Sequence, residues 1–380
     1  MNGKSSPVEI VEVSGKKLQK EFARFPFRLY ADCPNWVPPL PGEDTSTFNP
    51  SSNGSYAFCE AQRFLAVRGG QTVGRIAAII NHKANEKFGE KTVRFGWFDL
   101  IEDQDVFDAL IGAAQKWGKE RGCDTIKGPL GFTDMDKEGL LVEGFDKLSP
   151  LTCIYNYPYY PAMLEKAGFS KDADWTQRTL EIKDEEIPAF KIASQIEEHY
   201  GLHMAQAKSS FELSRKYGKE MFRVYNEVFA PLYQFTPLTD KQIKEYVSTF
   251  VPILNHRFVA ICLNKEDKPV GFLITVPSLS KVFRETGGKL FPFGVFKLKK
   301  ALSHNDTLEA LLIGILPEYQ WQGASILMFK YLHENCLKFG IKHLVMNPQL
   351  ENNTGAQTML GNSFEMELYM RRRSYCKKID

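Results

Sequence analysis

Residues 309–328 read Glu309-Ala-Leu-Leu-Ile-Gly-Ile-Leu-Pro317-Glu-Tyr-Gln320-Trp-Gln-Gly323-Ala-Ser325-Ile-Leu-Met328. The opening apolar run is too short to cross a membrane and suits a buried strand. Pro317 ends the strand because proline has no N–H to give to a sheet. After Ser325 the apolar residues recur at helical spacing. A strand that passes through a glycine turn into a helix leaves backbone N–H groups free at the helix start, and these can hold a phosphate or pyrophosphate.

The turn pattern alone also fits an ordinary connection between a strand and a helix in any α/β protein, so its context must decide. At 380 residues the chain is long for one core, which predicts two domains. Its formal net charge of +2 gives no reason to expect a nucleic-acid partner.

Targeting and redox signals point to the cytoplasm. The first twenty residues contain no apolar core of the signal-peptide type, and no segment has the length of a membrane span. The seven cysteines are scattered, without a Cys-x-x-Cys pair, which favours reduced thiols over disulfides or a zinc site. The histidines show no metal-ligand spacing, and we expect no metal.

The two halves of the chain show the same order of elements: a hairpin, a strand, a helix, a strand, a short helix and a strand. The hairpins are predicted at residues 64–80 and 258–276, and the long helices at 105–121 and 325–339. This repetition predicts a tandem duplication of one α/β (α+β) module, with modules at residues 1–183 and 184–380.

The two predicted modules differ at the turn before the long helix. Where the second module has Gln320 to Ser325, the first has Ile101-Glu-Asp-Gln-Asp105. Acidic side chains there would repel a pyrophosphate. We therefore expect the first module to be without cofactor and the second to bind it.

The pattern Gln320-x-x-Gly323-x-Ser325 resembles the acyl-CoA pyrophosphate loop of the GNAT superfamily of N-acetyltransferases, with Ser325 in place of the usual Gly or Ala. Downstream, Asn352-Asn353-Thr-Gly-Ala356 is similar to the Asn-x-x-Ala pattern that follows the last central strand in that family. The resemblance implies two GNAT-like modules, each a central mixed sheet flanked by helices. It also implies acetyl-CoA or a longer acyl-CoA as donor. The cofactor-binding residues that it indicates are Gly314, Ile315, Leu316, Gln320, Gln322, Gly323, Ala324, Ser325 and Asn353.

The whole chain also resembles a narrower bacterial group of two-domain GNAT-like proteins, which includes proteins proposed to be bacterial ceramide synthases. The stretches that carry this likeness are Asn35-Trp-Val-Pro-Pro39, Val73-Gly-Arg-Ile-Ala77, Gly139-Leu-Leu-Val-Glu-Gly-Phe-Asp146, Tyr157-Pro-Tyr-Tyr160, Lys289-Leu-Phe-Pro-Phe-Gly294 and Leu350-Glu-Asn-Asn353. The resemblance implies the superfamily more firmly than it implies a substrate.

In a GNAT-type reaction an amine attacks the thioester directly, so the enzyme needs a base for the ammonium and a donor for the oxyanion. The candidate bases are Glu309, Glu351 and Glu143, each of which could instead be a solvated or locally anchored acid. The family resemblance places the oxyanion donor on the backbone at residues 314–316. It also implies a tyrosine that protonates the thiolate, but Leu360 stands at that position, which leaves Tyr375 or water for the role.

A basic and aromatic segment at residues 289–302 contains three phenylalanines and four lysines. Such segments can lie on a membrane surface or bind an acyl chain. The alternative is a helix that packs its apolar side on its own domain.

These observations lead to the hypothesis of an acyl-CoA-dependent N-acyltransferase. It would transfer an acetyl or longer acyl group to a small-molecule amine, a lipid or sphingoid amine being one candidate. We expect it in the cytoplasm, with a peripheral contact at the inner membrane surface. A catalytically degenerate GNAT-fold protein that binds CoA or a lipid is the alternative, and a transferase that uses charged transfer RNA lacks a basic groove signal. The sequence does not specify an oligomeric state.

Overall fold

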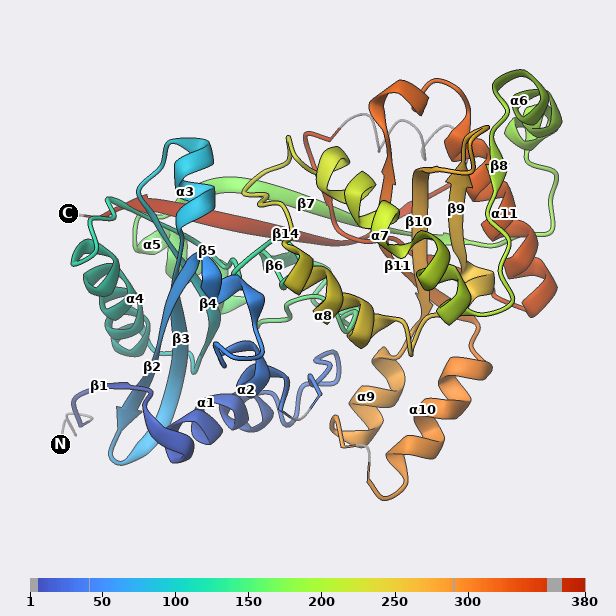
Figure 1. Ribbon diagram of the computed structural model, residues 1–380. Coiled ribbons are helices and arrows are strands. Elements are labelled where there is room, and N and C mark those ends of the chain that lie inside the picture. The colour runs from blue at the N-terminus through green and yellow to red at the C-terminus, as the bar shows by residue number, and fades with distance from the viewer. Residues whose placement is uncertain (1–5, 41, 290, 354–363, 380) are drawn as a thin grey trace. The chain divides into compact units, whose positions relative to one another are not determined.

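The computed structural model describes residues 6–40, 42–289, 291–353 and 364–379 (Figure 1). The chain falls into two compact units. Unit 1 comprises Met1–Trp175, Phe283–Lys289 and Met370–Asp380, and unit 2 comprises Thr176–Val282 and Leu290–Tyr369.

The division between the units lies at Trp175/Thr176, whereas the sequence places the boundary of the repeat at 183/184. The C-terminal residues also return to unit 1. A spatial division does not locate the ends of a duplicated sequence, so the repeat boundary stays a prediction.

The sheet of unit 1 has the strand order β1-β2-β3-β4-β5-β14. Its pairs are antiparallel except for β4 and β5, which run parallel. The strands are β1 (Glu9–Glu12), β2 (Cys59–Arg68), β3 (Gln71–Asn81), β4 (Thr92–Leu100), β5 (Thr125–Gly128), β6 (Leu140–Glu143), which pairs with β14, and β14 (Glu367–Lys378). The helices of this part of the chain are α1 (Gly15–Leu29), α2 (Glu43–Thr47), α3 (His82–Phe88), α4 (Gln104–Lys119) and α5 (Tyr159–Lys166).

Both faces of the unit 1 sheet are covered at its central strands, which explains the unbroken buried run along β3. Neighbouring residues of β2 and β3 point to opposite faces. Ile76 and Ala78 join the cluster that contains α4, while Ala77 and Ile79 join the cluster that contains Phe22 of α1.

The sheet of unit 2 has the order β8-β9-β10-β11-β12, followed by β7, which begins in unit 1. β11 and β12 run parallel, and the other pairs are antiparallel. The strands are β7 (Ser170–Glu181), β8 (His203–Met204), β9 (Val259–Leu263), β10 (Pro269–Pro277), β11 (Thr307–Ile315), β12 (His343–Val345) and β13 (Gln349–Leu350). The helices are α6 (Ala193–Tyr200), α7 (Ser210–Val228), α8 (Asp240–Phe250), α9 (Ser280–Thr286), which continues into unit 1, α10 (Gly294–Ser303) and α11 (Ala324–Phe339).

The two units repeat one arrangement of strands. In unit 1, β4 and β5 pair in parallel from Thr92↔Thr125 to Arg94↔Lys127, and in unit 2, β11 and β12 pair from Thr307↔His343 to Glu309↔Val345. In both units the longer strand then continues beyond its short partner. Ile101 follows Thr92 by the same number of residues as Leu316 follows Thr307. Ile101 N donates to Val73 O at 3.1 Å, and Leu316 N donates in the same way to Val270 O at 2.9 Å. This correspondence agrees with the predicted duplication.

A buried ion network joins four elements of unit 1. Arg75 of β3 donates from Nε to Asp99 of β4 at 2.7 Å and from a terminal nitrogen to Asp44 of α2 at 2.6 Å. Tyr30 donates to the other Asp99 oxygen at 2.9 Å, and Trp97 Nε1 to the other Asp44 oxygen at 2.8 Å. Burial alone would lower the pKa of Arg75, but the two carboxylates outweigh burial and raise it.

Replacing Arg75 by Met should destabilise the protein by about 3–5 kcal/mol, because two buried carboxylates lose their cation. Urea unfolding near neutral pH measures the change. The matched control is Arg28→Met, which removes an exposed pair with Glu21 and should cost less than about 1 kcal/mol. Equal losses in the two variants would show that the network does not hold these elements together.

Candidate functional site

The parallel strands of unit 2 separate at Glu309. β12 ends at Val345, which pairs with Glu309, whereas β11 continues to Ile315. Beyond Glu309, β11 keeps β10 on one side and has no strand partner on the other among the described residues. An open strand edge inside an α/β layer exposes backbone donors and acceptors to which a ligand can add.

The direction of the backbone amides shows which groups face this open edge. Leu316 N donates to Val270 O, on the β10 side. Because successive amides of a strand point to opposite sides, Gly314 N–H also faces β10, and Ile313 and Ile315 face the open edge. On that edge, the Ile315 carbonyl accepts a hydrogen bond from Gln320 Nε2 at 3.2 Å.

The strand is also bent near this edge. Leu312 pairs with Ile274 and Ala310 with Thr275, so Leu311 is an extra residue on β11. Such a β-bulge bends and twists the strand locally. The bulge lies between Glu309 and the open-edge amides, so it influences where those groups point.

The connection after β11 leads to the start of α11. Gly323 is the N-cap residue, with φ of +83° and no side-chain cap. A Cβ at this position would lie 2.4 Å from Ile196 Cδ1, and the positive φ also favours glycine. The amides of Gly323, Ala324 and Ser325 have no acceptor among the described residues. They lie at the positive end of the helix, where an anion is stabilised.

The corresponding helix of unit 1 is closed by the protein itself. The Asp103 side chain accepts a hydrogen bond from Val106 N at 3.1 Å and is bound by both terminal nitrogens of Arg68. The hydrogen bond from Arg68 lowers the pKa of Asp103, so the capping group stays charged. An internal carboxylate thus lies where unit 2 has free amides. That the first module is without cofactor stays a prediction.

Glu309 is a buried carboxyl group where the two parallel strands part. One of its oxygens accepts hydrogen bonds from Ser278 Oγ at 2.5 Å and Ser280 Oγ at 3.0 Å. Burial raises the pKa of Glu309, and the two hydroxyls offset part of the increase. A carboxylate with a raised pKa is a better proton acceptor near neutral pH than an exposed one.

The other predicted bases have different surroundings. Glu143 is exposed on β6 of unit 1, and its carboxylate lies 3.0 Å from Arg371 Nε. Glu351 is exposed in the turn after β13 of unit 2. Glu309 is the predicted base that lies at the parting of β11 and β12.

The remaining predicted residues are only partly described. Asn353 N donates to Leu350 O at 3.0 Å, while Ala356 and Leu360 lie outside the described residues. Gln322 donates from its side chain to Glu318 O at 2.8 Å. Tyr375 is buried in unit 1 and donates to Glu165 at 3.2 Å.

Four polar residues near the site carry no motif that would single them out in the sequence. Ser278 and Ser280 follow β10 and reach Glu309 only through the fold. Asn347 and Gln349 follow β12, and Asn347 Oδ1 and Gln349 Nε2 are buried without a hydrogen-bond partner in the part of the chain that the structure describes. Because buried polar atoms are nearly always paired, these two amides are candidates for contacts with a ligand.

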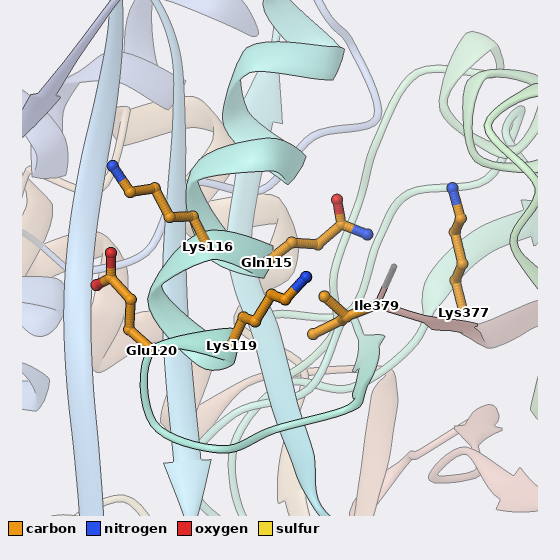
Figure 2. A pocket seen from close by; sticks show the side chains of 6 residues that line it. All are labelled: Gln115, Lys116, Lys119, Glu120, Lys377 and Ile379. Atoms are coloured by element: carbon orange, nitrogen blue, oxygen red, sulfur yellow. The ribbon is translucent and has the colours of Figure 1, made fainter.

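A separate hollow of about 330 Å³ lies on unit 1. Its lining residues are Gln115, Lys116, Lys119, Glu120, Lys377 and Ile379. Figure 2 shows Gln115 and Lys119 directed toward the C-terminal strand and Ile379 directed toward Lys119, whereas Lys116 and Glu120 point to the other side of the helix. None of the predicted site residues lines this hollow, so it does not coincide with the candidate site.

Two kinds of feature are absent from the described residues. They contain no group of three or more His, Cys, Asp or Glu side chains placed to hold a metal ion. No helix among them is both long and apolar enough to cross a membrane.

Known proteins resemble this chain over most of its length. Protein YghO of Escherichia coli (strain K12) is 31% identical over 379 residues, which cover 95% of this chain and 93% of that protein. A bacterial ceramide synthase of Caulobacter vibrioides (strain NA1000 / CB15N) is 28% identical over 323 residues, which cover 83% and 82% of the two chains. No protein-family model matches the sequence.

Solved structures resemble the fold at low sequence identity. A tandem GNAT protein from the clavulanic acid biosynthesis pathway matches with a TM-score of 0.55 and 12% identity, covering 98% of this chain and 99% of that one. A GCN5-related glucosamine N-acetyltransferase region of a fungal multi-domain β-N-acetylglucosaminidase matches with a TM-score of 0.57 and 11% identity, covering 98% of this chain and 38% of that one.

Replacing Glu309 by Gln should stabilise the protein at alkaline pH. Because the pKa of Glu309 is raised in the folded protein, ionising this group lowers the free energy of unfolding at pH values above that pKa. Below the ordinary value of 4.5 the group is protonated in both the folded and the unfolded protein, so the cost disappears. The advantage of the variant should therefore be present at about pH 8 and vanish below about pH 4. Melting temperatures across this range measure it.

The control is Glu266→Gln on the exposed β9–β10 turn, which should show no such pH-dependent gain. If Glu309→Gln tracks the wild type at every pH, Glu309 ionises without an energetic cost and its pKa is not raised.

Proposed function

The chain belongs to the family of Protein YghO and has the tandem GNAT fold, and on that premise we propose that it is an acyl-CoA-dependent N-acyltransferase. The likeness to a tandem GNAT protein over nearly the full length of both chains confirms the predicted fold class, two mixed-sheet modules flanked by helices. At 12% identity that likeness extends to the fold and not to the reaction. The proposed activity therefore rests on the site itself.

One observation carries the proposal: a single strand–turn–helix segment of unit 2 offers all three groups that the reaction needs. Glu309 supplies a buried base, the open edge of β11 supplies backbone donors, and the free amides from Gly323 supply an anion site. The corresponding segment of unit 1 has lost the anion site to Asp103. The proposed donor is acetyl-CoA or a longer acyl-CoA, with its pyrophosphate on the α11 amides.

The backbone geometry refines the proposed oxyanion donor. Among residues 314–316, the amides of Gly314 and Leu316 face β10, so only Ile315 is directed to the open edge. Ile315, however, lies about 20 Å along the strand from Glu309 at a rise of ~3.3 Å per residue. Ile313 faces the same edge and lies nearer to the base. We assign the oxyanion to the Ile313 amide and a contact with the pantetheine arm to Ile315.

The proposed acceptor is a small-molecule amine, and a lipid or sphingoid amine is the favoured class. The support for this class is the relative named a bacterial ceramide synthase, together with the basic and aromatic segment at residues 289–302. Peripheral contact with the inner face of a cytoplasmic membrane through that segment belongs to the same proposal. The two modules at 1–183 and 184–380 would then have different tasks, the second binding the donor.

Calorimetry with CoA, combined with an assay for thiol release from acetyl-CoA and a long-chain acyl-CoA, tests the proposal. Binding of CoA and thiol release in the presence of an amine are expected. Absence of CoA binding would refute it. Binding without turnover of short amines or sphingoid bases would instead support a degenerate GNAT-fold protein.

Replacing Gln320 by Glu should weaken CoA binding by about tenfold or more. The variant loses the donor that contacts the Ile315 carbonyl and adds a negative charge beside the proposed pyrophosphate site. Calorimetry measures the effect, and Gln206→Glu, the same charge change at an exposed position of unit 2, is the control. If both variants bind CoA equally well, the donor does not lie at this turn.

Replacing Glu309 by Gln should lower the rate of acyl transfer by about 100-fold or more, which is typical of losing a general base. In the wild type, the rate should rise with pH through the raised pKa of Glu309, because only the carboxylate accepts a proton. The variant should lose that rise while its affinity for CoA stays unchanged. A variant with the wild-type pH profile would assign the base to another residue.

A further inference from the structure

A group of exposed aromatic side chains lies at and before the start of α10. Phe291 is 84% exposed, Phe293 74% and Phe296 70%. Such exposed phenylalanines are unusual, and three within six residues concentrate exposed apolar area on one short segment. In Figure 1, α10 lies beyond the ends of β10 and β11.

The helix has two distinct faces. Gly294 and Ala301 are buried and Leu298 is partly buried, which places the packed stripe at spacings of four and three residues. Phe293, Phe296 and Lys300 lie on the opposite face. The phenylalanines thus do not serve the core of unit 2, since the smaller residues of the other stripe do.

The charge of this segment has a single sign. Residues 286–305 contain four lysines and no acidic residue. Lys299 and Lys300 are exposed, and neither has an ion-pair partner among the described residues. They lie within one turn of Phe296, so cationic and aromatic groups occupy the same surface.

The end of α10 is tied to the candidate base. Asn305 donates from its side chain to Ala301 O at 3.3 Å and to Ser278 O at 2.6 Å. Ser278 in turn donates to Glu309. The exposed aromatic helix is therefore connected to the proposed catalytic carboxylate through two residues of unit 2.

We propose that Phe291, Phe293, Phe296, Lys299 and Lys300 form a docking surface for an anionic lipid bilayer. Phenylalanine rings enter the boundary between headgroups and acyl chains, and lysines beside them bind the lipid phosphates. A second copy of the chain is a poorer occupant, because a symmetric contact would bring these lysines against one another. Docking would bring an amine acceptor dissolved in the membrane to the Glu309 end of β11. The docking surface deepens the membrane contact of the proposed function by naming its residues and its lipid. The supply of the acceptor rests on the proposed acyltransferase, whereas docking can be measured apart from that activity.

Vesicle sedimentation tests the docking surface. The full chain should bind vesicles of phosphatidylcholine with phosphatidylglycerol, and bind pure phosphatidylcholine at least about tenfold more weakly. Binding should weaken as salt is added. The triple variant Phe291→Ser/Phe293→Ser/Phe296→Ser and the double variant Lys299→Glu/Lys300→Glu should each lose at least about tenfold in affinity for the anionic vesicles.

Matched controls change the same residue types elsewhere in unit 2. Phe211→Ser removes a phenylalanine that is 74% exposed on α7, and Lys219→Glu/Lys244→Glu repeats the charge change at exposed sites. These controls should bind vesicles like the wild type. Equal losses in the controls, or no binding by the wild type, would overturn the proposal.

Two further measurements separate the alternatives. Light scattering reports the oligomeric state, and a wild-type dimer that the Phe variant converts to a monomer would show that a second copy covers this surface, against the proposal. CoA affinity should be the same in wild type and docking variants. Vesicle binding without CoA binding would support the docking surface and refute the proposed acyltransferase. CoA binding without vesicle binding would refute the docking surface and leave the acyltransferase proposal standing.

Discussion

The candidate site depends on the short parallel pairing of β11 with β12. Because β12 ends at Val345, β11 is paired on both sides only as far as Glu309 and has one open edge beyond it. β11 stays paired with β10 on its other side, except at the bulge at Leu311. The parting of the strands therefore costs unit 2 little of its sheet. It leaves the amides of Ile313 and Ile315 without a strand partner among the described residues, on the same strand as the buried carboxyl group of Glu309.

The same scaffold in unit 1 shows how few residues separate a binding site from a structural element. β4 and β5 part after an equally short pairing, but the position that matches Glu309 holds Arg94, whose guanidinium donates to the carbonyls of Gly131 and Phe132. At the helix start, the carboxylate of Asp103 takes the place of an external anion. The two units thus differ by a charge reversal at one position and by an internal cap at another, on the same backbone.

Buried carboxylates in the two units also differ in their partners. Asp44 and Asp99 each accept a hydrogen bond from the buried Arg75 guanidinium, which ties α2 and β4 to β3. Glu309 receives only the two serine hydroxyls, which are weaker partners for a negative charge. Burial therefore raises the pKa of Glu309, because the two hydroxyls offset only part of the cost of burying its charge.

The sequence determined the apolar strand that ends at Pro317, the glycine turn and the helix that begins near Ser325, because local periodicity and backbone chemistry act over neighbouring residues. It also predicted both modules and the acidic turn of the first. Only the tertiary structure brought Ser278 and Ser280 to Glu309, turned Gly314 and Leu316 toward β10, and exposed Phe291, Phe293 and Phe296 at and before the start of α10. These features depend on strand register, on where one strand ends and on which helix face is packed. They are set by contacts between residues far apart in the chain.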